Sequence, residues 1–178
     1  MLEGLRKKLG LRWARIYFKW KVKSDPYNPR EVLLNVKKIL ICLPKDPQLF
    51  QIGEGFLYQL KEKFAGAKFI IHGANGFRLR QENLFWGDFF LADRGDFGFF
   101  FFPKRILRRR LRAVGCDLAV DCHPDFNWEN SFLCGFSGAK LRASLEKKHC
   151  GLFFNFIVRI NPKNDLQKKY QTILKYLG

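Results

Sequence analysis

Three polar side chains follow closely on one apolar run, and together they have the composition of a ligand pocket. The run is 116–121, CDLAVD, which ends in Asp121, and His123 and Asp125 come directly after it. A short apolar run bounded by glycine and proline predicts a buried parallel strand that opens into a loop. Open α/β sheets bind ligands at the carboxyl ends of their strands, so we expect these three residues to line a polar pocket. For Asp125, capping of the following helix is the alternative interpretation.

Two other groups of reactive side chains do not have the arrangement that a metal site or a nucleophilic pair requires. Cys122, His123, Asp125 and Cys150 are of zinc-ligand types, but they lack the spacing of a known zinc site. His149 and Cys150 could form a nucleophilic pair, yet adjacent residues on a strand point to opposite faces. The five cysteines contain no CxxC pair, and three lie in apolar segments. We therefore expect reduced, mostly buried thiols, and neither a metal nor a cofactor.

The densest positive charge lies in 104–112, KRILRRRLR, which follows Pro103. Proline is favourable in the first turn of a helix, and apolar residues recur at helical spacing. We expect the following side chains to face the sheet: Ile106, Leu107, Leu111 and Val114. Arginine is well suited to phosphate, so a phosphate-binding surface is predicted for Arg105, Arg108, Arg109, Arg110 and Arg112. A solvated helix face is the alternative.

Residues 1–23 predict a basic amphipathic helix. Its apolar stripe comprises Leu2, Leu5, Leu9, Trp13, Ile16 and Trp20. Basic residues surround the stripe, among them Lys7, Lys8, Arg12 and Arg15. Such a helix can lie in a bilayer interface with Trp13 and Trp20 at headgroup level, where each Lys or Arg adds about 1 kcal/mol. The alternative is a helix that packs on the domain through the same stripe.

The remaining segments predict one α/β domain, which is the number expected for 178 residues. A turn-rich linker is expected at 24–35, and a loop with a short irregular helix at 77–96. Further strands are expected at 36–43, 67–72 and 152–160. Further helices are expected at 47–64, 127–136 and 166–177.

Two phrases, DLAVD at 117–121 and SGAKLR at 137–142, resemble motifs in the first half of the heptosyltransferase-like glycosyltransferases of family 9. The opening strand VKKILIC at 36–42 and the final helix YQTILKYLG at 170–178 extend the resemblance, which covers residues 36–178. It implies a single Rossmann-like three-layer domain with a mainly parallel sheet. This is half of the family's GT-B architecture, and the donor-nucleotide half is missing.

The family's catalytic carboxylate lies in a Gly-Asp pair after the opening strand, where it can deprotonate the acceptor hydroxyl. An ungapped correspondence places Gln48 and Leu49 at that pair, and leucine cannot take a proton. Asp46 is the candidate base if the loop is rebuilt, and Glu54 is a further candidate. A turn or helix-capping aspartate is the alternative interpretation of Asp46.

The net charge of +17 predicts a phosphate-rich partner. The leading hypothesis is a cytoplasmic protein, peripheral on the inner membrane face, that binds anionic lipid or a lipopolysaccharide precursor without transferring sugar alone. The second is an active glycosyltransferase that works as a homo-oligomer or with a donor-domain protein. The third is a nucleic-acid-binding protein, which the charge permits although no RRM, KH, zinc-finger or helix-turn-helix signature is present. No apolar run has the length of a membrane span, and no signal peptide is expected.

Overall fold

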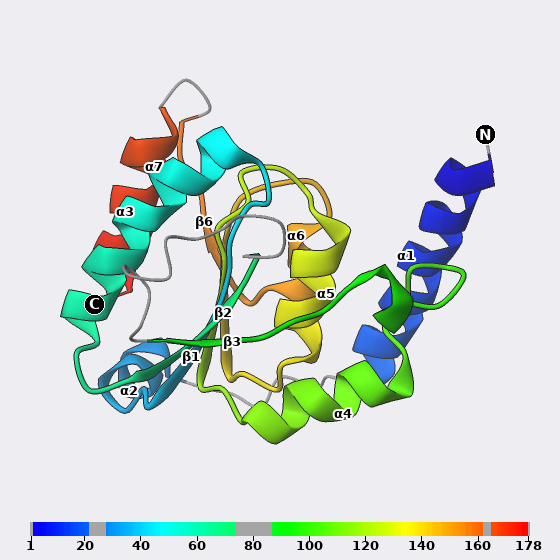
Figure 1. Ribbon diagram of the computed structural model, residues 1–178, viewed down its shortest axis with the longest axis horizontal. Coiled ribbons are helices and arrows are strands. Elements are labelled where there is room, and N and C mark those ends of the chain that lie inside the picture. The colour runs from blue at the N-terminus through cyan, green and yellow to red at the C-terminus, as the bar shows by residue number, and fades with distance from the viewer. Residues whose placement is uncertain (1, 22–27, 74–86, 162–164, 178) are drawn as a thin grey trace.

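The computed structural model describes residues 2–21, 28–73, 87–161 and 165–177. These residues form one sheet, with strand order β3-β2-β1-β4-β5-β6 and every neighbouring pair parallel (Figure 1). The strands are β1 (Lys38–Cys42), β2 (Lys68–His72), β3 (Gly87–Phe89), β4 (Leu118–Asp121), β5 (Leu141–Leu145) and β6 (Phe156–Val158). The order reverses between β1 and β4, as in doubly wound α/β folds. The predicted Rossmann-like three-layer domain is therefore confirmed.

The central strands are buried on both faces because helices cover each side of the sheet. Every residue of β4 is buried, and so is every residue of β1 and β2 after the first. This double burial explains why the strands have nearly continuous apolar sequences. Side chains still alternate, so that Ile39 and Ile41 face one helical layer while Leu40 and Cys42 face the other.

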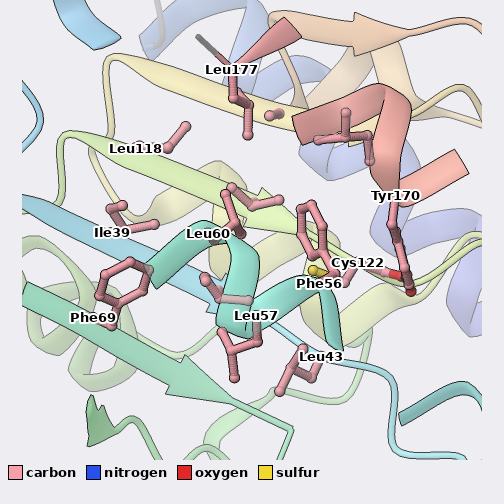
Figure 2. Packing of buried hydrophobic residues seen from close by; sticks show 14 of the residues in the cluster. Ile39, Leu43, Phe56, Leu57, Leu60, Phe69, Leu118, Cys122, Tyr170 and Leu177 are labelled. Carbon is pink, nitrogen blue, oxygen red and sulfur yellow. The ribbon is translucent and has the colours of Figure 1, made fainter. Parts of the chain in front are cut away.

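One outer layer consists of α2 (Pro29–Leu34), α3 (Pro47–Lys63) and α7 (Leu166–Tyr176). Figure 2 shows Phe56, Leu57 and Leu60 of α3 packed over the strands. The ring of Phe56 stacks on that of Tyr170 in α7, with the centroids 5.0 Å apart. The Tyr170 hydroxyl donates a hydrogen bond to the carbonyl oxygen of Cys122, which ties α7 to the end of β4.

The opposite layer consists of α1 (Leu2–Lys21), α4 (Arg105–Val114), α5 (Trp128–Phe136) and α6 (Cys150–Phe153). Its core is aromatic. The rings of Phe18, Phe132, Phe136 and Phe153 have centroid distances between 5.0 and 6.1 Å. Because Phe18 belongs to α1, the N-terminal helix is part of this packed layer.

Several segments differ from the sequence-based expectations. Strand β5 occupies a segment in which no strand was expected, because its burial between β4 and β6 outweighs local preference. The strand expected at 152–160 begins inside α6, and only Phe156–Val158 pair with β5. Residues 29–34 of the expected linker form α2. In the expected loop at 77–96, residues 77–86 lie outside the described residues, and the rest holds β3 and a short 3-10 helix at Arg94–Asp96.

Candidate functional site

Adjacent strands β1 and β4 send the chain to opposite layers, toward α3 and α5. The loops at 43–46 and 122–127 therefore diverge at the carboxyl edge of the sheet (Figure 1). Ligand sites of open α/β sheets form at such a point. Polar side chains from several elements meet there, and we call them the carboxyl-edge network: Lys45, His72, Asp121, Glu129, Asn130 and Lys147.

Asp121 is the centre of one half of this network. Its fully buried carboxylate accepts hydrogen bonds from the His123 amide nitrogen at 2.9 Å, Asn130 Nδ2 at 3.2 Å and Lys147 Nζ at 2.7 Å. Lys147 also donates to the carbonyl oxygen of His123 at 2.7 Å. Because both oxygens of Asp121 already accept hydrogen bonds, this residue fixes the loop after β4.

Glu129 is the centre of the other half. Lys45 Nζ lies 2.6 Å from Glu129 Oε2, and His72 Nε2 lies 3.1 Å from Oε1. The contact between His72 Nε2 and Glu129 Oε1 does not have hydrogen-bond geometry. Neither of these two atoms has a hydrogen-bond partner among the described residues. Burial raises the pKa of Glu129, but the contacts with His72 and Lys45 outweigh it and hold the pKa below its ordinary value. The other ring nitrogen of His72 lies 2.9 Å from the carbonyl oxygen of Phe90.

His123 and Asp125 lie beside the network in local roles. The amide nitrogen of Asp125 donates to His123 Nδ1 at 3.1 Å. Asn127 caps α5, because its Oδ1 accepts from the amide nitrogen of Asn130 at 3.0 Å. The structure therefore places Asp121 and His123 at one edge, as expected, whereas the interpretation of Asp125 as the helix cap is wrong.

Asp46 is exposed and caps α3. Its Oδ1 accepts hydrogen bonds from the amide nitrogens of Gln48 and Leu49, both at 3.0 Å. This is the capping arrangement that competed with the catalytic interpretation. Glu54 lies further along α3 and is half-buried.

The cysteine thiols are poorly suited to nucleophilic chemistry. Cys42, Cys116, Cys122 and Cys134 are buried free thiols, and Cys150 is half-buried. Burial raises the pKa of Cys42 and of Cys122 well above the usual value, and raises that of Cys116 to about 12. The prediction of mostly buried thiols is confirmed. Within the described ranges, no group of His, Cys and carboxylate side chains is arranged to hold a metal ion.

Three arginines of α4 contact residues of the helical layer to which α4 belongs. Arg108 lies 5.5–5.8 Å from the ring centroids of Tyr17, Phe102 and Phe136. Arg110 forms an ion pair with Asp96 at 3.5 Å, and Arg112 donates to the Tyr17 hydroxyl at 3.0 Å. These three arginines therefore also have partners within the domain, and the phosphate-binding surface stays a prediction.

Arg105 and Arg109 are exposed, as are Arg110 and Arg112, whereas Arg108 is half-buried. In Figure 1, α4 runs along the lower border, while the loops after β1 and β4 lie at the top. The arginines of α4 and the residues around Asp121 therefore do not form one site. Ile106 was expected to face the sheet, but it is 69% exposed, so that expectation is wrong.

Helix α1 packs on the domain through a face other than the predicted stripe. Gly10, Ala14 and Phe18 are buried in the aromatic layer. The helix passes so close to Phe100 that a Cβ on Gly10 would lie 2.1 Å from the carbonyl oxygen of Phe100. Large side chains of the predicted stripe are exposed instead: Leu2, Leu5, Trp13, Ile16 and Trp20. The interpretation of this stripe as the packing face is therefore wrong.

A basic stripe runs beside the exposed apolar one. It consists of four exposed residues, Lys8, Arg12, Arg15 and Lys19. Each of them directly precedes a residue of the apolar stripe, so the two stripes lie side by side along the helix. We call these two stripes together the outward face of α1. Lys7 lies apart from it, because it pairs with Glu3 at 2.8 Å and lies near the ring of Phe101. Exposed Phe99 lies beside Arg6 at the same end of the helix.

Comparison with models of protein families, with curated proteins and with solved structures found no match. The fold and the site define a Rossmann-like α/β domain, and the resemblance to glycosyltransferase family 9 stays a prediction. None of the helices in the described residues combines the length and apolar character needed to cross a bilayer.

Sequence reasoning missed most of the carboxyl-edge network, namely Lys45, His72, Glu129, Asn130 and Lys147. The signal that could have found two of them was position. His72 ends the second strand and Lys45 follows the first, and parallel strands end at the same edge of a sheet.

Proposed function

We propose that this protein is a peripheral membrane-binding domain that attaches to an anionic glycolipid through the outward face of α1 and transfers no sugar on its own. The observation that carries the proposal is the orientation of one helix. Trp13 and Trp20 are 58% and 77% exposed, although the same helix is fixed to the domain through Ala14 and Phe18. A contiguous apolar face with a basic border is typical of a helix that lies in a membrane interface.

The positive charge of α1 and of the whole chain favours an anionic lipid. The basic stripe places four cations next to the exposed tryptophans, and the whole chain carries a net charge of +17. Each cation near an anionic surface contributes about 1 kcal/mol before screening by salt. The resemblance of residues 36–178 to family 9 supports a lipopolysaccharide precursor or a similar glycolipid, at the inner face of the cytoplasmic membrane.

Flotation with lipid vesicles tests the proposal. We expect the protein to float with vesicles that contain anionic lipid, to float less as salt is added, and to remain behind with neutral vesicles. The double variant Trp13→Ala/Trp20→Ala removes the aromatic anchors and is expected to lose flotation. Arg12→Gln should weaken partitioning by about fivefold, the equivalent of about 1 kcal/mol.

A matched control removes exposed apolar side chains elsewhere. Leu34 on α2 and Ile106 on α4 are exposed and lie outside α1, so Leu34→Ala/Ile106→Ala should float like the unmodified protein. Flotation that is indifferent to lipid charge, or that survives loss of both tryptophans, would overturn the proposal.

Sugar transfer with a donor-domain partner is the second candidate function, and Glu129 is the observation that favours it. This carboxylate lies where β1 and β4 diverge, and its Oε1 has no hydrogen-bond partner among the residues that the structure describes. It is ionised at neutral pH, as a general base must be. Turnover of a nucleotide sugar that is lost in Glu129→Gln but kept in Asp46→Asn would support this candidate.

A further inference from the structure

A surface pocket of about 360 Å³ lies between α1 and the segment that connects β5 to α6. It is lined by Arg15, Lys147, His149, Cys150, Gly151 and Leu152. Three of these residues carry cationic or titratable nitrogen atoms, and they come from two separate parts of the chain. The pocket is thus a meeting point between the basic stripe of α1 and the carboxyl-edge network.

Two of the nitrogen-bearing side chains of this pocket, Arg15 and His149, have no carboxylate partner among the described residues, whereas the third, Lys147, is only 3% exposed. Lys147 uses two of the three N–H groups of its ammonium, on Asp121 and on the His123 carbonyl oxygen. Neither Arg15 nor His149 forms an ion pair within the described parts of the chain. Among the described residues, the carboxylate that pairs with a lining residue is that of Asp121, which binds Lys147.

His149 lies among positively charged side chains. Burial lowers the pKa of this imidazole, and the nearby charges of Lys148 and Arg15 lower it further. The groups that face His149 are Arg15 on α1, Lys147 and Lys148 before it, the thiol of Cys150 after it, and the ring of Phe126 at 5.2 Å. None of them is an anion, so a bound anion would relieve the repulsion.

We propose that this pocket binds a phosphoryl group through Arg15 and His149. An arginine fork is a common donor to phosphate oxygens in proteins, and a protonated imidazole donates through both of its ring nitrogens. The volume exceeds that of inorganic phosphate and is at the lower end of small-molecule sites, which leaves room for a headgroup or a sugar attached to the phosphate. The inference deepens the proposed function, and it rests on that function for the view that the phosphate belongs to a lipid.

The first test uses the protein in solution with inorganic phosphate. Histidine side-chain resonances are titrated by NMR with and without phosphate, and His149→Asn assigns the His149 signal. Asparagine is chosen because His149 has a φ of 62°, and Asn tolerates this left-handed region. Phosphate should raise the pKa of His149, because the anion stabilises the imidazolium, and binding should tighten as pH falls. An unchanged His149 titration at saturating phosphate would overturn the proposal.

Matched variants test the assignment of residues. Arg15→Gln and His149→Asn should each weaken phosphate binding about tenfold, the equivalent of one charge-assisted hydrogen bond. Lys148→Gln removes the same charge from an exposed neighbour that does not line the pocket, and it should bind phosphate nearly as the unmodified protein does. Equal losses in all three variants would mean that net charge alone attracts the ion, and would overturn the site.

A vesicle experiment then separates the two sources of phosphate. Vesicles with a phosphomonoester lipid are compared with phosphodiester vesicles of equal surface charge. A preference for the monoester that Arg15→Gln and His149→Asn abolish identifies a lipid headgroup. Phosphate binding in solution without that preference identifies a soluble phosphorylated ligand. The tryptophan variant in flotation tests membrane attachment by itself, so failure of the pocket and failure of the proposed function give different results.

Discussion

Lys147 Nζ lies 2.7 Å from Asp121 Oδ2, and the two side chains are 3% and 0% exposed. This ion pair joins the loop after β5 to the end of β4, across the carboxyl edge of the sheet. A buried pair contributes little compared with apolar residues of the same volume, but removal of one partner leaves an uncompensated buried charge.

Lys147→Met should therefore lower the free energy of unfolding by about 3–5 kcal/mol in urea denaturation. The double variant Lys147→Met/Asp121→Leu should recover part of this loss, because no lone charge remains. Arg159→Met breaks the exposed pair with Glu146 and should cost less than about 1 kcal/mol. Similar losses from Lys147→Met and Arg159→Met would contradict the account of a buried pair.

Glu129 predicts a specific dependence of stability on pH. Its folded-state pKa lies below the ordinary 4.5, so the unfolded chain binds the proton more readily. The stabilising contribution is present above the unfolded pKa and is lost as pH falls through the folded pKa. Unfolding midpoints measured across the acid range should fall less steeply in Glu129→Gln than in the unmodified protein. Lys45→Met should give a similar flattening, and parallel curves for all three proteins would refute the assignment.

Two glycines of α1 should respond in opposite ways to alanine. At Gly10 the new Cβ would meet the carbonyl oxygen of Phe100, so Gly10→Ala should destabilise the protein by about 1–3 kcal/mol. At Gly4 nothing lies within 4 Å of the new Cβ, so Gly4→Ala should stabilise it by about 0.5–1 kcal/mol through helix propensity. Thermal unfolding measures both changes, and a gain in stability for Gly10→Ala would show that the helix does not pack closely on residue 100.

The thiols should differ in reactivity. Burial and raised pKa values keep Cys42, Cys116 and Cys122 protonated at neutral pH, whereas Cys150 is half-buried at the pocket. A thiol reagent followed by mass spectrometry should label Cys150 first in the native protein, and all five cysteines after denaturation. Rapid native labelling of Cys116 would contradict the packing around β4.

Most of the sheet could be predicted because its central strands are short apolar runs that end at proline, glycine or a polar residue. Strand β5 could not, because LRASL contains Arg142 and Ser144 and becomes a strand only through pairing with β4 and β6. The strand expected at 152–160 was only partly correct for a similar reason. Its first residues are apolar but belong to α6, which contacts α5.

The candidate site was predicted less completely than the fold. Asp121 was found because it ends an apolar strand. Lys147 was not, because its partner lies 26 residues away and the surrounding EKKH sequence is typical of a solvated turn. On α1, helical periodicity found the apolar stripe of Trp13 and Trp20 but could not tell that Gly10, Ala14 and Phe18 would form the packing face.

Because α1 is already docked on the aromatic layer through Ala14 and Phe18, adsorption to a bilayer would order no new segment of this helix. An amphipathic peptide that becomes helical only when it binds a membrane loses backbone entropy on binding. In this protein the helix already loses that entropy when the domain folds. If α1 binds a membrane as proposed, the docked helix would also give the whole domain one orientation relative to the lipid plane. The pocket lined by Arg15 would then lie at a fixed depth relative to the acyl chains, where it could reach the lipid headgroups.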